Sequence, residues 1–401
     1  MSDRYDDRRN DRPRFARYGT VALLVGLLAA GLSALGYLLS PDAFFPAYLI
    51  AFLFWLGISL GSLAIAMLHH LSGGGWGVPI RRVLEAAYGV LPLMAVLFVP
   101  LLFGLSELYL WARPSEVAHD DILLGKARYL NAEWFPFRAA AYFAVWMLFG
   151  FILNRLSASA DPATARLRER RLALVSGPGL ICWALAVTFA SIDWVMSLEP
   201  HWYSSMYGVL FMAGQGVSAL AAAILCVITL RRASPWNEQA ATSRLHDLGN
   251  LLLAFVLFWS YVSFMQFLII WSGNLPEDTP YYIHRTGSWQ AVAVALAALH
   301  FAVPFLLLLV RQNKRRTRRL AAIAALLLAM RLVDLYWLVM PTFSPGRLTF
   351  HWLHLVLPVA IGGLWLAMFS WRLAARSALP VLDPLPSEEE EAHRDAAQPA
   401  H

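Results

Sequence analysis

A series of apolar stretches that recurs along the whole chain is the strongest constraint on the fold. Read through a 19-residue window, about ten stretches are long enough to cross a bilayer. Several of them carry His, Asp, Arg or Gln well inside. An ionisable side chain at membrane depth costs at least a few kcal/mol unless it is paired or hydrated, so each is a candidate functional residue.

Composition agrees with a membrane protein. Hydrophobic residues make up 59% of the 401 residues, charged residues only 14%, and the mean hydropathy is +0.55, which excludes an ordinary soluble domain. The net charge of +6 arises from basic residues between the apolar stretches, so we expect no nucleic-acid partner. Cys182 and Cys226 lie inside apolar stretches without a Cys-x-x-Cys motif, which gives a disulfide or metal site little support.

The sequence therefore predicts an all-α integral membrane protein with about ten transmembrane helices. The predicted spans are 18–39, 46–70, 83–108, 137–157, 176–198, 207–230, 248–271, 289–310, 320–340 and 350–371. Arg and Lys cluster before the first span and after the second, fourth, sixth, eighth and tenth spans. Because cytoplasmic loops carry the excess of basic residues, we expect both termini in the cytoplasm.

Four regions follow from this pattern. Residues 1–16 are charged and are expected to form a mobile cytoplasmic N-terminus, and 17–376 form the transmembrane domain. Residues 377–401 are Pro-rich and acidic, which predicts a cytoplasmic tail. Segment 109–136 is too long for a turn, so we expect a periplasmic loop that packs on other residues.

Polar residues in the outer half of the predicted spans, or near their middle, form a candidate proton path on the periplasmic side. They are Asp193, Gln266, His300, Arg331, Asp334, His351 and His354. Arg331 and Asp334 are three residues apart and can pair, so a structural ion pair and a proton relay remain equally open. His300 has no local partner, and imidazole exchanges protons near neutral pH. For Gln266, which shares a helical face with Trp259 and Ser263, hydrogen bonding between helices is favoured over binding a quinone carbonyl.

A second polar group lies near the predicted cytoplasmic edge. It consists of His69, His70, Glu85, His246 and Asp247. These residues are candidates for proton uptake from the cytoplasm. Simple hydration at the interface is the favoured alternative, since long polar side chains near span ends reach water easily.

Three segments of the chain resemble a known family. They are AFLFWLGISLGSLAIAMLHHLSGGGWG (51–77), DWVMSLEPHWYSSMYG (193–208) and FWSYVSFMQFLIIWSGNLPEDTPYY (258–282). They are similar to the two ten-span membrane subunits of alternative complex III, a bacterial quinol:cytochrome c oxidoreductase. Both are related to the NrfD and polysulfide reductase membrane anchors. The compact length and the HHLSGGGWG loop resemble the smaller of these two sister proteins more than the larger one.

The resemblance implies two four-helix bundles, spans 2–5 and 6–9, flanked by spans 1 and 10. It implies a place in the bacterial inner membrane beside a sister NrfD-like protein, an iron–sulfur protein, c-type cytochromes and lipids, with a terminal oxidase as a further candidate partner. Iron–sulfur clusters and haem c would belong to those partners, and a quinone or menaquinone is the cofactor that this chain would contact.

Three functions stay open. The first is an accessory role in proton conduction, coupling and assembly, with no activity for the chain alone, because no catalytic or metal-ligating motif is recognisable. The second is a quinol-binding redox role in the same complex. The third, a secondary transporter, is the weakest, because Pro92, Pro100, Pro304 and Pro358 do not interrupt matching spans of the two halves.

Overall fold

The computed structural model describes residues 3–158, 164–231 and 238–375. Within these ranges the chain is helical and has no strand. Ten of the described segments are long and apolar enough to cross a membrane. The predicted all-α class and the ten predicted spans are therefore confirmed, and the structure supports a multi-pass membrane protein.

Eight of the ten spans are formed by single long helices. These are α1 (Asp3–Leu39), α2 (Pro41–Ser72), α8 (Phe135–Ser157), α9 (Ala165–Trp194), α10 (Tyr207–Arg231), α11 (Glu238–Gly273), α16 (Thr317–Val339) and α17 (Leu353–Ala375). The third span is made of α3 (Arg81–Tyr88) and α4 (Leu91–Phe103). The eighth is made of α13 (Trp289–Ala295), the π-helical segment η4 (Leu296–Ala302) and α14 (Val303–Leu309).

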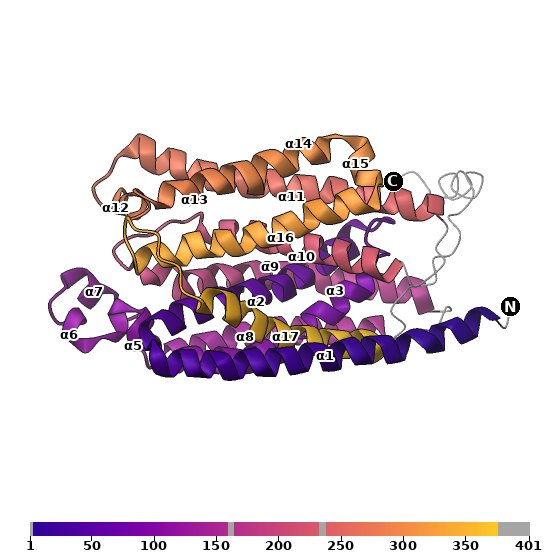
Figure 1. Cartoon of the computed structure of the whole chain (residues 1–401), viewed down its shortest axis with the longest axis horizontal. Helices are drawn as coiled ribbons and strands as arrows, with labels where there is room; N and C mark the ends of the chain where they lie inside the picture. Colours follow the sequence, from indigo (N-terminus) through magenta and orange to yellow (C-terminus); the bar gives the residue numbers. More distant parts are fainter. Residues whose placement is uncertain (1–2, 159–163, 232–237, 376–401) are drawn as a thin grey trace.

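Short helices connect the spans. They are α5 (Leu105–Leu108), η1 (Leu110–Ala112), α6 (Pro114–Val117), α7 (Asp121–Lys126), η3 (Met196–Leu198), α12 (Pro280–Ile283), α15 (Arg311–Arg315) and η5 (Met340–Thr342). The long helices run side by side along the long axis of the molecule (Figure 1). The "basic end" is the end with α15, the start of α1 and the end of α17; the "loop end", opposite, carries α5, α6, α7 and α12 (Figure 1).

Helices α2 and α10 form the centre of the molecule. Each is buried along most of its length, and they pack against each other. Helix α2 also contacts α9 and α17, while α10 contacts α9, α11 and α16. Two tryptophans tie α2 to α17: Trp55 Nε1 donates to the Pro358 carbonyl at 2.8 Å, and Trp365 Nε1 donates to Ser59 Oγ at 2.9 Å.

The outer helices leave their apolar side chains exposed. Helix α1 packs along α17, but Leu28 and Leu38 of α1 are 77% and 75% exposed. Such a surface would be unfavourable in water, and it is the surface expected of a helix that faces lipid tails.

Several helices extend beyond the predicted spans. Helix α9 begins at Ala165 rather than 176, α11 at Glu238 rather than 248, and α1 already at Asp3. Hydropathy detects only the apolar part of a helix, whereas Arg and Glu are good helix formers that continue it past the hydrocarbon region. The predicted acidic tail, 377–401, lies outside the described residues.

The long segment 109–136 packs on the connection between the fifth and sixth spans. Lys126 Nζ donates to the Pro200 carbonyl at 2.5 Å, and His201 Nε2 lies 2.6 Å from Asp120 Oδ2. The Tyr109 hydroxyl donates to the carbonyl of Trp194 at 2.9 Å. These contacts join two segments that are far apart in the sequence and explain why a connection of this length is ordered.

Candidate functional site

The central polar cluster lies between α10, α11, η4 and α16. Its residues are Trp259, His300, Arg331 and Asp334. Arg331 Nη1 donates to Asp334 Oδ2, and Trp259 Nε1 donates to the same oxygen at 3.1 Å. The Trp259 and His300 rings lie 4.0 Å apart between centroids. The pair predicted from the i, i+3 spacing is thus present, and Trp259 and His300 extend it across two more helices.

All four side chains of this cluster are buried, each at most 5% exposed. Arg331 lies beside Gly214 of α10, where an added Cβ would come within 2.3 Å of the guanidinium carbon. The absence of a side chain at position 214 therefore makes room for the arginine head. An ion pair in such a place is stable only with good geometry and further hydrogen bonds, and the Trp259 indole supplies one of them.

His300 is the member of the cluster with free hydrogen-bonding capacity. Neither ring nitrogen has a hydrogen-bond partner among the described residues, although the side chain is 1% exposed. The residue lies in the π-helical segment η4, and π-helical turns occur frequently at functional sites. An imidazole in this setting can accept a proton from, or donate one to, a water molecule or ligand that reaches it.

Asp193, which the sequence grouped with His300 and Asp334, has its hydrogen-bond partners among the described residues in a different cluster. It lies in α9 and accepts two hydrogen bonds on Oδ2, from Arg138 Nε and from the Tyr142 hydroxyl, both at 2.8 Å. Within the described part of the chain it has no hydrogen bond or ion pair with the central cluster. Shared depth predicted a shared path, but the helices place these carboxylates in separate parts of the molecule.

The remaining candidates of the predicted periplasmic path lie closer to the loop end. His354 Nδ1 lies 3.0 Å from the His351 carbonyl, and His354 Nε2 lies 3.4 Å from Met340 Sδ. Gln266 is buried and accepts a long hydrogen bond of 3.4 Å from Ser204 Oγ. Of the seven predicted residues, the structure therefore brings only His300, Arg331 and Asp334 into one cluster.

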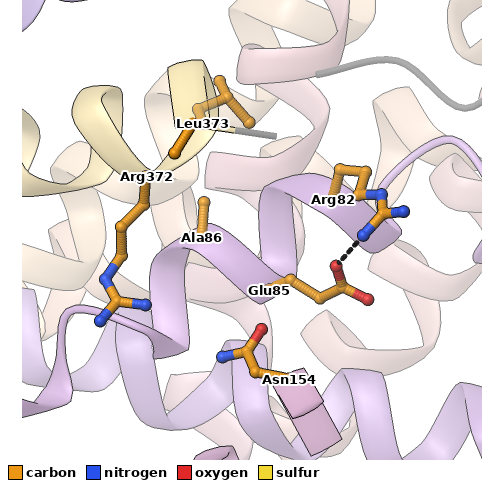
Figure 2. Close-up of a pocket in the computed structure, with 7 residues that line it drawn as sticks. Arg82, Glu85, Ala86, Asn154, Arg372 and Leu373 are labelled. Atoms are coloured by element: carbon orange, nitrogen blue, oxygen red, sulfur yellow. Dashed lines mark hydrogen bonds and ion pairs between the residues drawn. The ribbon is translucent and has the colours of Figure 1, made fainter. Parts of the chain in front are cut away.

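The candidates for proton uptake also divide into separate groups at the basic end. Glu85 pairs with Arg81 at 3.2 Å and with Arg82 at 2.7 Å (Figure 2), and Ser157 Oγ donates to it. His69 Nε2 lies 3.1 Å from the Gly74 carbonyl, and the His70 ring lies beside the His69 ring.

His246 and Asp247 form the third group at the basic end. His246 Nδ1 lies 3.7 Å from Asp247 Oδ1 and 3.3 Å from Asn250 Nδ2, and the Asp247 side chain is 47% exposed. The exposed position agrees with simple hydration, the alternative favoured from the sequence.

A polar cluster at the loop end was not predicted. Glu199 Oε1 accepts hydrogen bonds from Arg285 Nη1 at 2.9 Å and from Thr342 Oγ1 at 3.1 Å, and Oε2 lies 3.2 Å from His284 Nδ1. The Arg285 guanidinium is buried and lies 3.5 Å from the Tyr281 ring centroid. This cluster joins three connections, at η3, α12 and η5, that are far apart in the sequence.

Burial, hydrogen bonding and charge act on Glu199 in opposite directions. Burial by itself raises the pKa of this carboxyl, but the His284 hydrogen bond and the Arg285 charge outweigh it, so the pKa lies below 4.5. Burial also raises the pKa of Tyr281 to about 12. Glu199 is therefore ionised at neutral pH and balances the charge of Arg285.

We expect Glu199→Gln to lower stability at neutral pH by about 1.5–3 kcal/mol, the range for hydrogen bonds to charged groups. A lowered folded-state pKa stabilises the wild type above 4.5, and this stabilisation is lost as the pH falls through the folded pKa. The gap in unfolding temperature between wild type and variant should therefore shrink in acid. Thermal unfolding in detergent across this pH range measures it; a gap that is constant with pH would contradict the assignment.

Arg138, Glu199 and Arg285 were not among the candidate residues predicted from the sequence. Arg138 lies just inside the predicted fourth span, so its depth was a usable signal that Asp193 had a cationic partner. Glu199 and Arg285 lie in connections, where charged residues are common, and nothing in their spacing shows that they meet. Only the packing of the connections on one another buries them.

No protein-family model matches the chain, and no curated protein matches it.

Proposed function

We propose that this chain is an NrfD-like membrane subunit of a bacterial quinol:cytochrome c oxidoreductase related to alternative complex III, and that it corresponds to the smaller of the two sister proteins. Its role is to conduct protons and to couple their movement to quinol oxidation in the inner membrane. The observation that carries the proposal is the buried central cluster. There the ring nitrogens of His300 have no partner among the described residues, and the ring lies against Trp259. Trp259 in turn donates a hydrogen bond to Asp334 of the Arg331–Asp334 pair.

The chemistry of this cluster suits proton transfer. Trp259 contacts both His300 and Asp334, so one indole ring links the two titratable groups. Arg331 places a positive charge directly beside Asp334. Because the indole N–H only donates, a proton would move between the imidazole and the carboxylate through water that enters the cluster, and Arg331 would balance the carboxylate charge.

Helix contacts support the arrangement that the resemblance implies. Helices α2, α3–α4, α8 and α9 would form the first bundle, and α10, α11, α13–α14 and α16 the second, with α1 and α17 outside. The fifth and ninth spans each carry a buried Asp bonded to an Arg, Asp193 and Asp334, and each is followed by a 3₁₀ turn, η3 or η5. The same feature in two spans that are four apart is expected if the two bundles are repeats of one another.

The basic end would face the cytoplasm, with both termini there and segment 109–136 in the periplasm. Electron transfer would rest with the partners, a sister NrfD-like protein, an iron–sulfur protein and c-type cytochromes, which would hold the iron–sulfur clusters and haem c. A quinol, or menaquinol, would be oxidised to the quinone within the assembled complex, with its two electrons passing to those partners and its two protons released. The buried amide of Gln266, with its long bond to Ser204, is the position that favours the second candidate function, quinol binding by this chain.

The test uses the assembled complex in lipid vesicles. His300→Ala is expected to lower proton release coupled to quinol oxidation by about tenfold or more, since a positioned acid–base group contributes on the order of 10²–10⁴ to rate. His119→Ala is the matched control, because His119 is exposed at the loop end and its ring contacts the Ser115 carbonyl of its own segment. Unchanged proton release by a fully assembled His300→Ala complex would refute the proton role. A raised KM for quinol in Gln266→Ala would instead favour the quinol-binding role.

A further inference from the structure

Helix α11 carries a tyrosine on its outer surface, deep inside the seventh span. Tyr261 is 57% exposed, whereas Trp259, two residues earlier and on the opposite side of the helix, is buried and donates to Asp334. The span covers Ser243–Gly273, so Tyr261 is 12 residues, or about 18 Å of helix, from the nearer end. Because the hydrocarbon core of a bilayer is about 30 Å thick, this side chain lies near its middle.

The Tyr261 hydroxyl has no hydrogen bond to any of the described residues. Lipid tails offer neither water nor an acceptor, and a hydroxyl without a hydrogen bond is unfavourable in hydrocarbon. Tyrosine is favoured instead at the two edges of a membrane, where the ring faces lipid and the hydroxyl reaches water. A partner that supplies an acceptor at this depth would satisfy the Tyr261 hydroxyl.

The other exposed Tyr and Trp side chains among the described residues follow the rule for membrane edges. Tyr129 and Tyr203 lie in connections. The rest lie no more than four residues from the end of a span; they are Tyr18, Tyr37, Trp134, Trp271, Trp352 and Trp371. Tyr261 is therefore an exception within the described part of the chain, and its position needs an explanation specific to α11.

Tyr261 belongs to an aromatic-rich stripe along the outer side of α11, which we call the α11 stripe. Its members are exposed and recur at steps of three, four or seven residues, which places them on one face. They are Leu257, Tyr261, Phe264 and Trp271. By contrast, the exposed side chains in the middle of α9, Ile181 and Leu185, are aliphatic. Aromatic residues are enriched where proteins meet one another, so the α11 stripe resembles a protein interface more than a lipid-facing surface.

The charge at the basic end of α11 favours a partner that differs from this chain. Asp247 lies 14 residues before Tyr261, about four turns along the same side, and its side chain is 47% exposed. In a dimer with a two-fold axis along the membrane normal, each residue of the stripe would meet its own copy, so two Asp247 carboxylates would face each other. A basic residue of a different protein would instead pair with Asp247.

We propose that the α11 stripe binds a transmembrane helix of a different membrane protein. That helix supplies a hydrogen-bond acceptor, such as a Ser, Asn or Gln side chain, at the depth of the Tyr261 hydroxyl, and small residues that let it approach Leu257 and Phe264. It also carries a basic residue near Asp247, about 21 Å along the axis from that acceptor. The surface requires only that the chain lies in a membrane, and it does not depend on the function proposed above.

Photo-crosslinking of the full chain in its native membranes tests the surface. With p-benzoyl-phenylalanine at position 261, illumination is expected to attach α11 to a transmembrane segment of another polypeptide, which peptide mass spectrometry identifies together with its acceptor and its basic residue. The matched control carries the same photoreactive residue at position 185, because Leu185 is 56% exposed in the middle of α9. Adducts with lipid alone, with a second copy of this chain, or with the same protein from both positions would overturn the proposal.

Tyr261→Phe tests the hydroxyl separately, because it keeps the ring and removes only the oxygen. Association with the crosslinked protein in mild detergent should weaken by about three- to tenfold, the range expected for one hydrogen bond between transmembrane helices. Tyr18→Phe is the matched control, since Tyr18 is exposed near the start of the first span. The unfolding temperature of the chain should stay unchanged in both variants, and a Tyr261→Phe protein that associates as tightly as wild type would contradict the proposal.

Discussion

Asp334→Ala is expected to destabilise the protein by about 3–5 kcal/mol, the cost of leaving one member of a buried ion pair without its partner. Arg331 is 3% exposed and would stay charged beside Gly214 with no carboxylate to balance it. The Trp259 indole would also lose its acceptor. The measurement is the unfolding temperature in detergent, together with the amount of folded protein recovered from membranes.

The double variant Arg331→Met with Asp334→Leu separates structure from function. Replacing a buried ion pair with apolar residues of similar volume is often neutral or stabilising, so we expect the double variant to regain most of the lost stability. Recovery of folding without proton coupling would assign a relay role to the pair. Recovery of both would make it a structural ion pair, and an Asp334→Ala protein as stable as wild type would contradict the burial of Arg331.

Gly61→Ala is expected to be the most damaging small substitution in the centre of the molecule. An added Cβ would lie 2.1 Å from the backbone oxygen of Gln215 and 2.9 Å from the Ala219 Cβ. Because the obstacle is the backbone of α10, no side-chain rotation relieves the clash, and α2 and α10 must move apart. Overpacking of this kind costs about 1–3 kcal/mol or more, which should lower the unfolding temperature.

Gly57→Ala is the matched control, one turn earlier on the same helix. An added Cβ there lies 3.7 Å from the Gln215 Cγ, an ordinary contact. Alanine is also the better helix former by about 0.5–1 kcal/mol, so this variant should be neutral or slightly more stable. Equal effects of the two substitutions would show that α2 and α10 do not approach each other as closely as the structure places them.

Local patterns predicted the features that depend on neighbouring residues. The ten spans were found because each needs roughly 20 consecutive apolar residues, which hydropathy reads directly. The Arg331–Asp334 pair was found because three residues on a helix bring two side chains to one face. The packing of segment 109–136 followed from its length and is seen in the Lys126 and Asp120 contacts.

The partners of the polar residues were decided by packing. Asp193 and Arg138 are 55 residues apart, and Glu199 and Arg285 are 86 apart. The depth of a residue in the membrane depends on its position along one helix, so it can be predicted from the sequence of that span. Which helix lies beside which, and how each is rotated about its axis, depends on side-chain fit between distant segments.

By itself the sequence determined the all-α class, the ten spans and the polar residues inside them, because the cost of exposing peptide groups and charges to lipid acts on each segment separately. The tertiary structure alone decided that Asp193 and Asp334 lie in different clusters, that His300 lies against Trp259, and that Tyr261 faces out of the molecule. Those results depend on contacts between helices distant in the chain, and one sequence does not encode them in any local pattern.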